Sequence, residues 1–246
     1  MILIHLKNII IDFFALIYNS RRSRCVFYHD IHKKQKFTSM STSAKLFKEH
    51  ILFIRNKGFN IVHNIEHKNY EIEIHFDDGW CGIYYNLHLI TQLNVPVTIF
   101  LITSLINTKN YLTTEQIKEM DKNPLINFQS HTHTHVNLTE LLDSEIDLEL
   151  KKSKNMLKKI CSNTIDSICY PRGFFCKKII KQAVKTGYRK QYCSIPGAYF
   201  SNIFGVKKRS LIQDLSLRGL NSVLKGGDNI LYFWYLNKHF KRWEFV

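Results

Sequence analysis

EIEIHFDDGW, residues 71–80, begins with polar and apolar side chains in alternation and ends with two aspartates before a glycine. The alternation from Glu71 to Phe76 has the period of two that is typical of a β-strand, and Gly79 lets the chain turn where the strand ends. Neighbouring side chains on a regular strand point to opposite faces. Asp77 and Asp78 can therefore serve one pocket only if the backbone leaves the sheet at this point. A solvated Asp-Asp-Gly turn is the simpler alternative for this stretch alone.

Short apolar strands alternate with helical segments on both sides of this stretch. The expected elements are, in order, the strand CVFYHD (25–30), a helix in 41–58, the strand at 71–76, a helix at 84–93, the strand VPVTIFLI (95–102), a helix at 114–121, the strand LINFQSH (125–131), a long helix at 139–160, the strand SICYP (167–171), a helix at 177–185 and the strand RKQYCS (189–194). Repeated strand–helix units predict an α/β fold with a parallel sheet, either a barrel or a doubly wound sheet. Ligands of such folds gather at the carboxyl ends of the strands, which is where the two aspartates lie.

Composition indicates one main domain, which we place at residues 24–246. The chain has 246 residues, 45% of them hydrophobic, which suffices for one sizeable core. Its formal charge of +15 comes from dispersed lysines, and the run KKSKNMLKK (151–159) is expected to form a solvated helix face. We therefore expect no nucleic-acid partner, although a basic surface suits anionic lipid headgroups or phosphate-bearing glycan carriers.

Six cysteines without a CxxC pair favour free, mostly buried thiols in a reducing compartment, and hence a cytoplasmic location.

The N-terminal segment, residues 1–23, is apolar up to Tyr18 and is interrupted by Lys7 and Asp12. It lacks the basic start and the small-residue cleavage site of a signal peptide. Two alternatives remain open. Arg21, Arg22 and Arg24 could hold an interfacial helix against an anionic leaflet at the inner face of a membrane, or the helix packs on the surface of its own domain.

The second informative stretch is QSHTHTHVNL, residues 129–138, again at the end of an apolar strand. Three histidines within five residues are hard to attribute to packing and suggest metal binding. On a continuing strand His131, His133 and His135 would share one face. If the chain turns instead, His131 and His135 converge and His133 lies at the rim. Either arrangement can include one carboxylate.

Two histidines and one carboxylate leave open positions on an ion, as catalytic sites require. An ion held in this way lowers the pKa of its bound water to around 7 and polarises the carbonyl under attack. A second carboxylate that does not bind the ion can then accept the proton of the water. The pair in FDDG thus has an interpretation in which one aspartate binds the ion and its neighbour acts as the base.

A third strand end has the sequence CYPRGFF, residues 169–175. Proline and glycine shape a tight turn there, whose backbone N–H groups can stabilise an oxyanion, and Arg172 adds a positive charge. Taken alone, this motif is also typical of an ordinary turn.

In this order the three stretches resemble the polysaccharide deacetylase family, carbohydrate esterase family 4. FDDG is similar to the first motif of the family, TFDDG; HTHTH to the second, H(S/T)xxH; and YPRG to the third, RxPYG. FYHDI and the segment 41–62 resemble the opening segment of family members that act on surface glycans. The resemblance covers roughly residues 25–225. It implies a distorted (β/α) barrel that hydrolyses an N-acetyl or O-acetyl group from a sugar, most often with zinc.

Carried over by position, the resemblance makes Asp77 the catalytic base and Asp78, His131 and His135 the ligands of a divalent metal ion, expected to be Zn²⁺. His133 falls on a variable position of the second motif. The backbone N–H of Arg172, at the position of the family's tyrosine, would help to stabilise the oxyanion.

Two departures from the family pattern stand out. Cys169 occupies the position of the arginine that orients the base, so Arg172 or Arg209, the latter in VKKRSLI (206–212), would have to supply that charge. The histidine that serves as general acid has no clear copy. His239 is the only late histidine, with a surface or core role expected, and His29 could lie in the pocket, so the proton donor is unassigned.

The sequence therefore predicts a hydrolase of non-peptide C–N bonds. It would remove an acyl group, N-acetyl in the first place and formyl as an alternative, from a sugar in surface polysaccharide or glycolipid biosynthesis. The expected partner is an acylated sugar, either nucleotide-linked or lipid-linked, met in the cytoplasm with peripheral membrane contact through residues 1–23. The alternative is a catalytically inactive glycan-binding protein on the same fold, which the missing arginine and acid histidine would explain.

Overall fold

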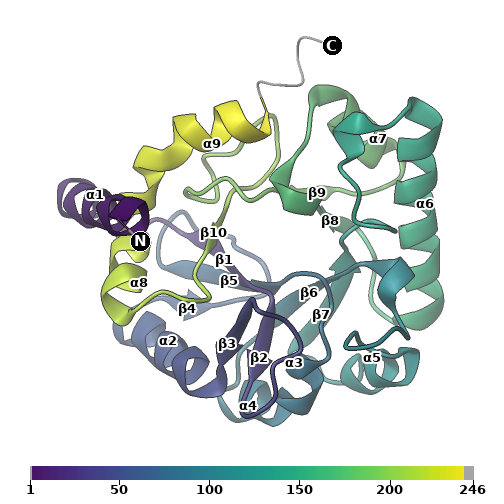
Figure 1. The fold of residues 1–246 in the computed structure, drawn as a ribbon, viewed down its shortest axis with the longest axis horizontal. Helices are drawn as coiled ribbons and strands as arrows, with labels where there is room; N and C mark the ends of the chain where they lie inside the picture. The colour runs from purple at the N-terminus through teal and green to yellow at the C-terminus, as the bar shows by residue number, and fades with distance from the viewer. Residues whose placement is uncertain (1, 241–246) are drawn as a thin grey trace.

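The computed structural model describes residues 2–240 and has a parallel sheet at its centre (Figure 1). The strand order is β10-β1-β5-β6-β7-β8-β9, with β4 beside β5. The strands are β1 (Arg24–Tyr28), β4 (Asn60–Ile61), β5 (Glu71–Phe76), β6 (Val97–Leu101), β7 (Ile126–Ser130), β8 (Ser167–Cys169), β9 (Lys190–Tyr192) and β10 (Arg209–Leu211). A separate two-stranded sheet joins β2 (Asp30–His32) to β3 (Ser41–Ser43).

The sheet curves into a nearly closed barrel. Its two outer strands, β9 and β10, meet through a bridge between Tyr192 and Lys207 and through the Cys193 N–H, which donates to the Lys207 carbonyl at 3.0 Å. This closure confirms the barrel and excludes the doubly wound alternative, in which the outer strands would lie at opposite edges of an open sheet.

Helices surround the barrel in Figure 1. They are α1 (Ile2–Tyr18), α2 (Ala44–Asn56), α3 (Gly82–Tyr85), α4 (Leu87–Gln92), α5 (Thr114–Met120), α6 (Asp143–Ile160), α7 (Lys177–Lys185), α8 (Leu217–Leu224) and α9 (Tyr232–His239). The helix expected at 84–93 is two short helices. Asn86 separates them, because its side-chain amide donates to the Ile31 and Gly82 carbonyls.

The long helix α6 starts four residues later than expected, after a 3₁₀ turn over Leu138–Glu140. The Glu145 carboxylate accepts from the Leu142 N–H at 2.7 Å and satisfies a donor at the new start. The lysine run 151–159 lies on α6 and forms the expected solvated face except at Lys154, which is buried with its ammonium over the Tyr188 ring.

Helix α1 packs on the domain through the same residues that interrupt its apolar sequence. Asp12 pairs with Arg218 on α8 at 2.8 Å and accepts from Ser222, while the Lys7 ammonium lies 3.4 Å from the Tyr235 hydroxyl on α9. The opposite face is exposed and apolar, formed by Leu6, Ile9, Ile10, Phe13, Leu16 and Ile17. Within residues 2–240 no helix has the length and apolar character needed to cross a membrane.

Arg24 does not lie beside this helix as a free cation, contrary to the interfacial alternative of the sequence. It is fully buried on β1 and pairs with Asp228 at 2.9 Å.

Apolar side chains fill the space between barrel and helices, whereas the barrel interior is unusually polar. Alternate residues of β5 point inward. Glu73, His75 and, just past the strand, Asp77 are all buried there, next to Cys25 on β1 and Arg209 on β10.

Candidate functional site

The chain leaves the sheet directly after Asp77. Asp78 has φ of 74° and Gly79 has φ of 87°, both in the left-handed region. A side chain at position 79 would also collide with Leu101, whose Cδ2 lies 2.6 Å from the place of a Cβ. This turn brings two consecutive carboxylates to the same end of the barrel, which a regular strand cannot do.

Asp78, His131 and His135 converge on one point. The Asp78 Oδ1 lies 3.6 Å from the His131 Nε2 and 3.7 Å from the His135 Nε2. His131 Nδ1 contacts the Cys169 carbonyl at 2.8 Å. Since a carbonyl only accepts, Nδ1 carries a proton, and Nε2 faces the other two groups. The chemistry and the orientation of the three donors fit a divalent ion with open positions.

His133 lies outside this group. Its Nδ1 contacts the Thr103 hydroxyl at 2.9 Å, and the Glu149 carboxylate on α6 accepts from the backbone N–H groups of His133 and Thr134. The chain turns here, with φ of 67° at Thr132 and 61° at His135. Of the two arrangements open in the sequence, the structure has the one in which His131 and His135 converge.

Arg209 supplies the positive charge at Asp77. Its guanidinium donates to both carboxylate oxygens, at 2.7 Å and 2.6 Å, and both side chains are buried. Burial alone would raise the pKa of Asp77, but the charge and hydrogen bonds of Arg209 outweigh it and hold the pKa well below its usual range. Asp77 is therefore an ionised carboxylate of fixed orientation.

Cys169 lies beside this pair, with its Sγ 2.7 Å from the Arg209 guanidinium. Asp77, His131 and Cys169 are close enough to form a second possible ligand group. The group around Asp78 fits an ion better, because both oxygens of Asp77 are already engaged by Arg209.

An open cleft of about 750 Å³ adjoins Asp78 and His135. Tyr111, Arg172 and Phe174 also line it, and Tyr111 stacks on Trp80 with 4.2 Å between ring centroids. Arg172 follows β8 in a 3₁₀ turn over Pro171–Gly173, with φ of 55°. It borders the cleft and does not pair with Asp77, so the two candidate arginines occupy different places.

The other two histidines considered for the site differ in position. His239 is buried between the Phe174 and Tyr235 rings, at 4.9 Å and 5.5 Å, which gives it a core role. His29 contacts the Gln213 side chain at 2.7 Å.

Sequence reasoning missed two groups that orient the candidate ligands. The Trp80 indole N–H donates to the second oxygen of Asp78 at 3.0 Å, and the Cys169 carbonyl fixes the tautomer of His131. Trp80 directly follows FDDG and could have been noticed. The carbonyl of Cys169 carries no side-chain signal.

The polysaccharide deacetylase family model matches residues 64–190, about half of the chain. YxkH of Bacillus subtilis, whose name assigns it to the polysaccharide deacetylases, is 29% identical over 182 residues, which are 70% of this chain and 64% of that protein. The poly-beta-1,6-N-acetyl-D-glucosamine N-deacetylase of Staphylococcus epidermidis is 33% identical over 128 residues, 46% of this chain and 44% of that protein. The chain thus spans less than two thirds of the length of these relatives.

Solved structures share the fold. The Streptococcus pyogenes deacetylase PplD, in complex with acetate, superposes with a TM-score of 0.72 at 20% identity and covers 82% of this chain and 98% of its own. IcaB from Ammonifex degensii gives a TM-score of 0.71 at 17% identity, with 84% and 98% covered. The family model, the curated relatives and the barrel agree, and the chain belongs to the polysaccharide deacetylase family.

Proposed function

We propose that this protein is a metal-dependent deacetylase that hydrolyses an N-acetyl group of a sugar. The observation that carries the proposal is the convergence of the Asp78, His131 and His135 ligand atoms next to a second, ionised carboxylate, Asp77, which does not share in the ligand group.

The three ligands would hold a divalent ion, with zinc expected from the nitrogen and oxygen donors. Such an ion supplies an activated water and polarises the acyl carbonyl. Asp77 is oriented by Arg209 and accepts the proton of the attacking water. Because Arg209 keeps the pKa of Asp77 low, the protonated carboxyl is a strong acid and readily returns the proton to the departing nitrogen. This role for Asp77 would account for the missing acid histidine.

The cleft supplies the remaining parts. The Arg172 backbone N–H, in the turn after β8, is the proposed oxyanion donor. Tyr111, which stacks on Trp80, and Phe174 line the cleft, and their rings suit the apolar face of a sugar ring. Arg209 at Asp77 also removes one of the two reasons for considering an inactive glycan-binding protein.

The proposed substrate is an N-acetylglucosamine-containing surface glycan or its nucleotide-linked or lipid-linked precursor. The name of the staphylococcal relatives supports the sugar and the acyl group. All six cysteines are free, which supports a reducing, cytoplasmic location. The exposed apolar face of α1 supports contact with the inner face of a membrane, where a lipid-linked glycan would be met.

The test combines metal content with acetate release on N-acetylglucosamine oligomers and nucleotide-linked N-acetyl sugars, with and without chelator. We expect chelator-sensitive release. Asp77→Asn should keep the ion at this site and lose roughly 10²- to 10⁴-fold in kcat. Asp78→Asn should lose both that ion and turnover.

His133→Asn is the matched control within the same motif, because His133 contacts Thr103 and not the ligand group. It should keep the ion and turn over within a few-fold of the wild type. Full activity of Asp77→Asn would refute the assigned base. Bound metal and bound sugar with no release of acetate would favour the inactive glycan-binding alternative.

A further inference from the structure

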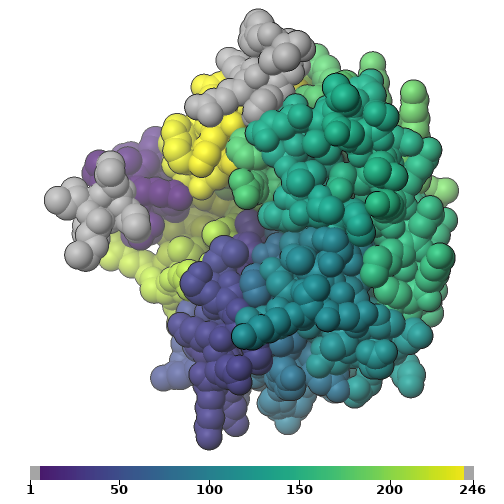
Figure 2. Space-filling view, turned by 45° about the vertical axis from the view of Figure 1, so that its right-hand side comes forward, coloured from purple at the N-terminus to yellow at the C-terminus, as the bar shows by residue number. Residues whose placement is uncertain are grey.

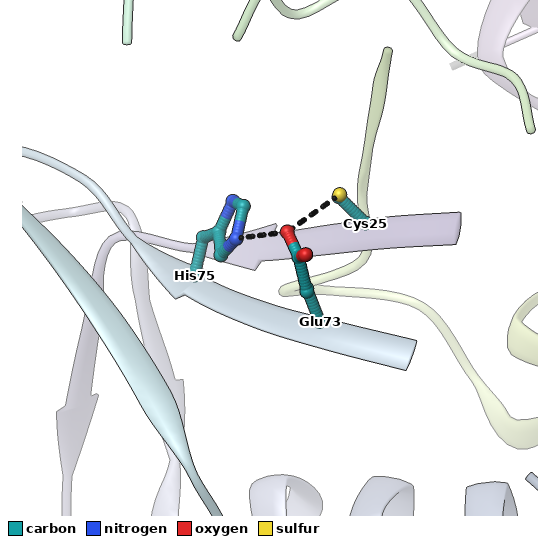
Figure 3. A group of neighbouring side chains, drawn as sticks. All are labelled: Cys25, Glu73 and His75. Carbon is teal, nitrogen blue, oxygen red and sulfur yellow. Dashed lines mark hydrogen bonds and ion pairs between the residues drawn. The ribbon is translucent and has the colours of Figure 1, made fainter. Parts of the chain in front are cut away.

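A second group of metal-ligand side chains, Cys25, Glu73 and His75, lies inside the barrel (Figure 3). Cys25 comes from β1, and Glu73 and His75 come from β5; Cys25 and Glu73 are paired in register. Glu73 precedes Asp77 by four residues, about 13 Å along an extended strand. The group therefore shares no residue with the site formed by Asp78 and the two histidines.

The three side chains meet at one carboxylate oxygen. The Glu73 Oε2 lies 3.1 Å from the Cys25 Sγ and 3.1 Å from the His75 Nε2. Tetrahedral zinc with ligand bonds of about 2.0–2.3 Å separates neighbouring ligand atoms by about 3.3–3.6 Å. Outward shifts of a few tenths of an ångström would admit an ion. The Tyr192 hydroxyl, 3.1 Å from the same oxygen, offers a fourth donor.

Without an ion, Glu73 is the acceptor of a buried polar network. It accepts from the Ile65 N–H at 2.9 Å and is contacted by the Cys25 thiol, the His75 ring and the Tyr192 hydroxyl. A carboxylate that accepts from this many donors is ionised. Two cations lie near this group: Arg209 is already engaged by Asp77, and the Lys207 ammonium lies over the Tyr199 ring.

One feature of that network points to a missing cation. A buried carboxylate without a fixed counter-charge is costly, and Glu73 is 1% exposed. The neighbouring His75 ring balances its charge only when that ring is protonated.

We propose that Cys25, Glu73 and His75 bind a second divalent ion of the zinc class, which ties β1 to β5 inside the barrel. Binding releases one proton, from the Cys25 thiol, while the His75 proton moves from Nε2 to Nδ1. The ion, the thiolate and the carboxylate then sum to zero charge, which is the state that a buried site favours.

The burial of the group determines how it is loaded. All three side chains are at most 1% exposed, so an ion enters before the barrel closes and exchanges slowly afterwards. The site at Asp78 borders an open cleft and exchanges quickly. A brief exposure to chelator should therefore remove the ion at Asp78 and leave the buried ion in place.

The experiment counts metal per chain in the full protein, purified from zinc-supplemented cells, before and after brief chelation. The wild type should hold two ions and keep one after chelation. Asp78→Asn should hold one resistant ion. Cys25→Ser should hold one ion, which the chelator removes. Because the two variants affect different ions, failure of this proposal is distinguishable from failure of the proposed deacetylase site.

Cobalt gives an independent readout. A thiolate ligand of Co²⁺ produces an intense charge-transfer band in the near ultraviolet. The Asp78 site has no thiolate and cannot give this band. The protein refolded with Co²⁺ should show this band in the wild type and in Asp78→Asn, and lose it in Cys25→Ser. Cys193→Ser, a buried thiol outside the group, is the matched control and should keep the band.

A wild type with a single ion per chain, or a cobalt-loaded wild type without the thiolate band, would overturn the proposal whether or not the variants fold. A band unchanged in Cys25→Ser, or lost in Cys193→Ser, would assign the thiolate elsewhere and overturn it as well.

Discussion

At the scale of single residues, the site depends on one ion pair that bridges distant parts of the chain. Asp77 follows β5 and Arg209 begins β10, 132 positions later, yet their side chains form two hydrogen bonds in the barrel interior. The thiol of Cys169 fits beside the guanidinium instead of supplying a charge. The positive charge that the third motif lacks thus comes from another strand.

Replacing Arg209 with Met should change the pH dependence of the reaction. In the wild type the pKa of Asp77 lies below its usual range, so this proposed base stays ionised throughout the neutral and mildly acidic range. In Arg209→Met, burial acts unopposed and raises that pKa. The proposed base is then protonated at a higher pH than in the wild type, and the acid limb of kcat/KM should move up by roughly two pH units or more. The measurement is the pH profile of acetate release.

Loss of one partner of a buried ion pair also costs about 3–5 kcal/mol of unfolding free energy. Arg24→Met is the matched control, since it removes another buried arginine, paired with Asp228, away from Asp77. It should destabilise the protein in the same way and leave the acid limb in place. An unmoved acid limb in Arg209→Met would show that Asp77 does not set the protonation of the active enzyme.

At the scale of elements, the carboxyl of Asp30 is buried where β2 packs against α3. Asp30 opens β2 and is fully buried against the start of α3. A Cβ at Gly82 would lie 2.3 Å from both Asp30 carboxylate oxygens, so only glycine permits this approach. Burial raises the pKa of Asp30 to about 7.

This carboxyl should make stability fall as pH rises toward neutrality. The folded protein binds the Asp30 proton up to about pH 7, whereas the unfolded chain releases it near pH 4. The contribution of the protonated carboxyl is therefore full below about pH 4 and is lost as pH rises through 7, by up to roughly 4 kcal/mol of unfolding free energy. Urea unfolding at pH 5 and pH 8 measures it.

Asp30→Asn cannot ionise and should show a smaller loss between these two pH values than the wild type. Asp147→Asn, at an exposed acid on α6, should behave as the wild type does. Equal losses in the wild type and in Asp30→Asn would contradict the assignment.

At the scale of the whole molecule, α1 lies outside the barrel beside α8 and α9 (Figure 1), and its purple atoms stand at the edge of the space-filling view (Figure 2). Its charged residues contact the domain, and its outer face is a stripe in which Phe13, Leu16 and Ile17 are 58%, 73% and 59% exposed. Spacing of three and four residues places such side chains on one helix face. Arg21 and Arg22 follow close by.

We expect the wild type to sediment with vesicles that contain anionic phosphatidylglycerol and less with neutral phosphatidylcholine, because apolar burial and charge act together. Phe13→Glu/Leu16→Glu should abolish sedimentation at unchanged far-ultraviolet circular dichroism. Val184→Glu, at an exposed apolar residue on α7, is the control and should still bind. A wild type that binds neither kind of vesicle, or that forms a dimer that the double variant does not form, would show that the exposed apolar face of α1 binds another partner.

The sequence by itself determined the features that depend on near neighbours along the chain. Hydrophobic periodicity and capping residues predicted the strands β5, β6 and β7 and the helices α2, α5 and α7 closely, and local motifs placed Asp77, Asp78, His131 and His135 at strand ends. The helices α3, α4 and α6 differed from prediction. The Asn86 contact with Ile31 and the N-cap of α6 at Leu142 depend on packing and local hydrogen bonds that periodicity does not show.

Only the tertiary structure decided what depends on closure of the barrel. The sheet closes into a barrel and does not stay open. Arg209, and not Arg172, is the partner of Asp77. The chain turns so that His131 and His135 converge, and the three histidines do not share one strand face. The tertiary structure also assembled Cys25, Glu73 and His75, which no local motif marks. The sequence did not reveal these outcomes, because side chains far apart along the chain meet only when the strands are in register. Spacing along the chain carries no information about their distance in the folded barrel.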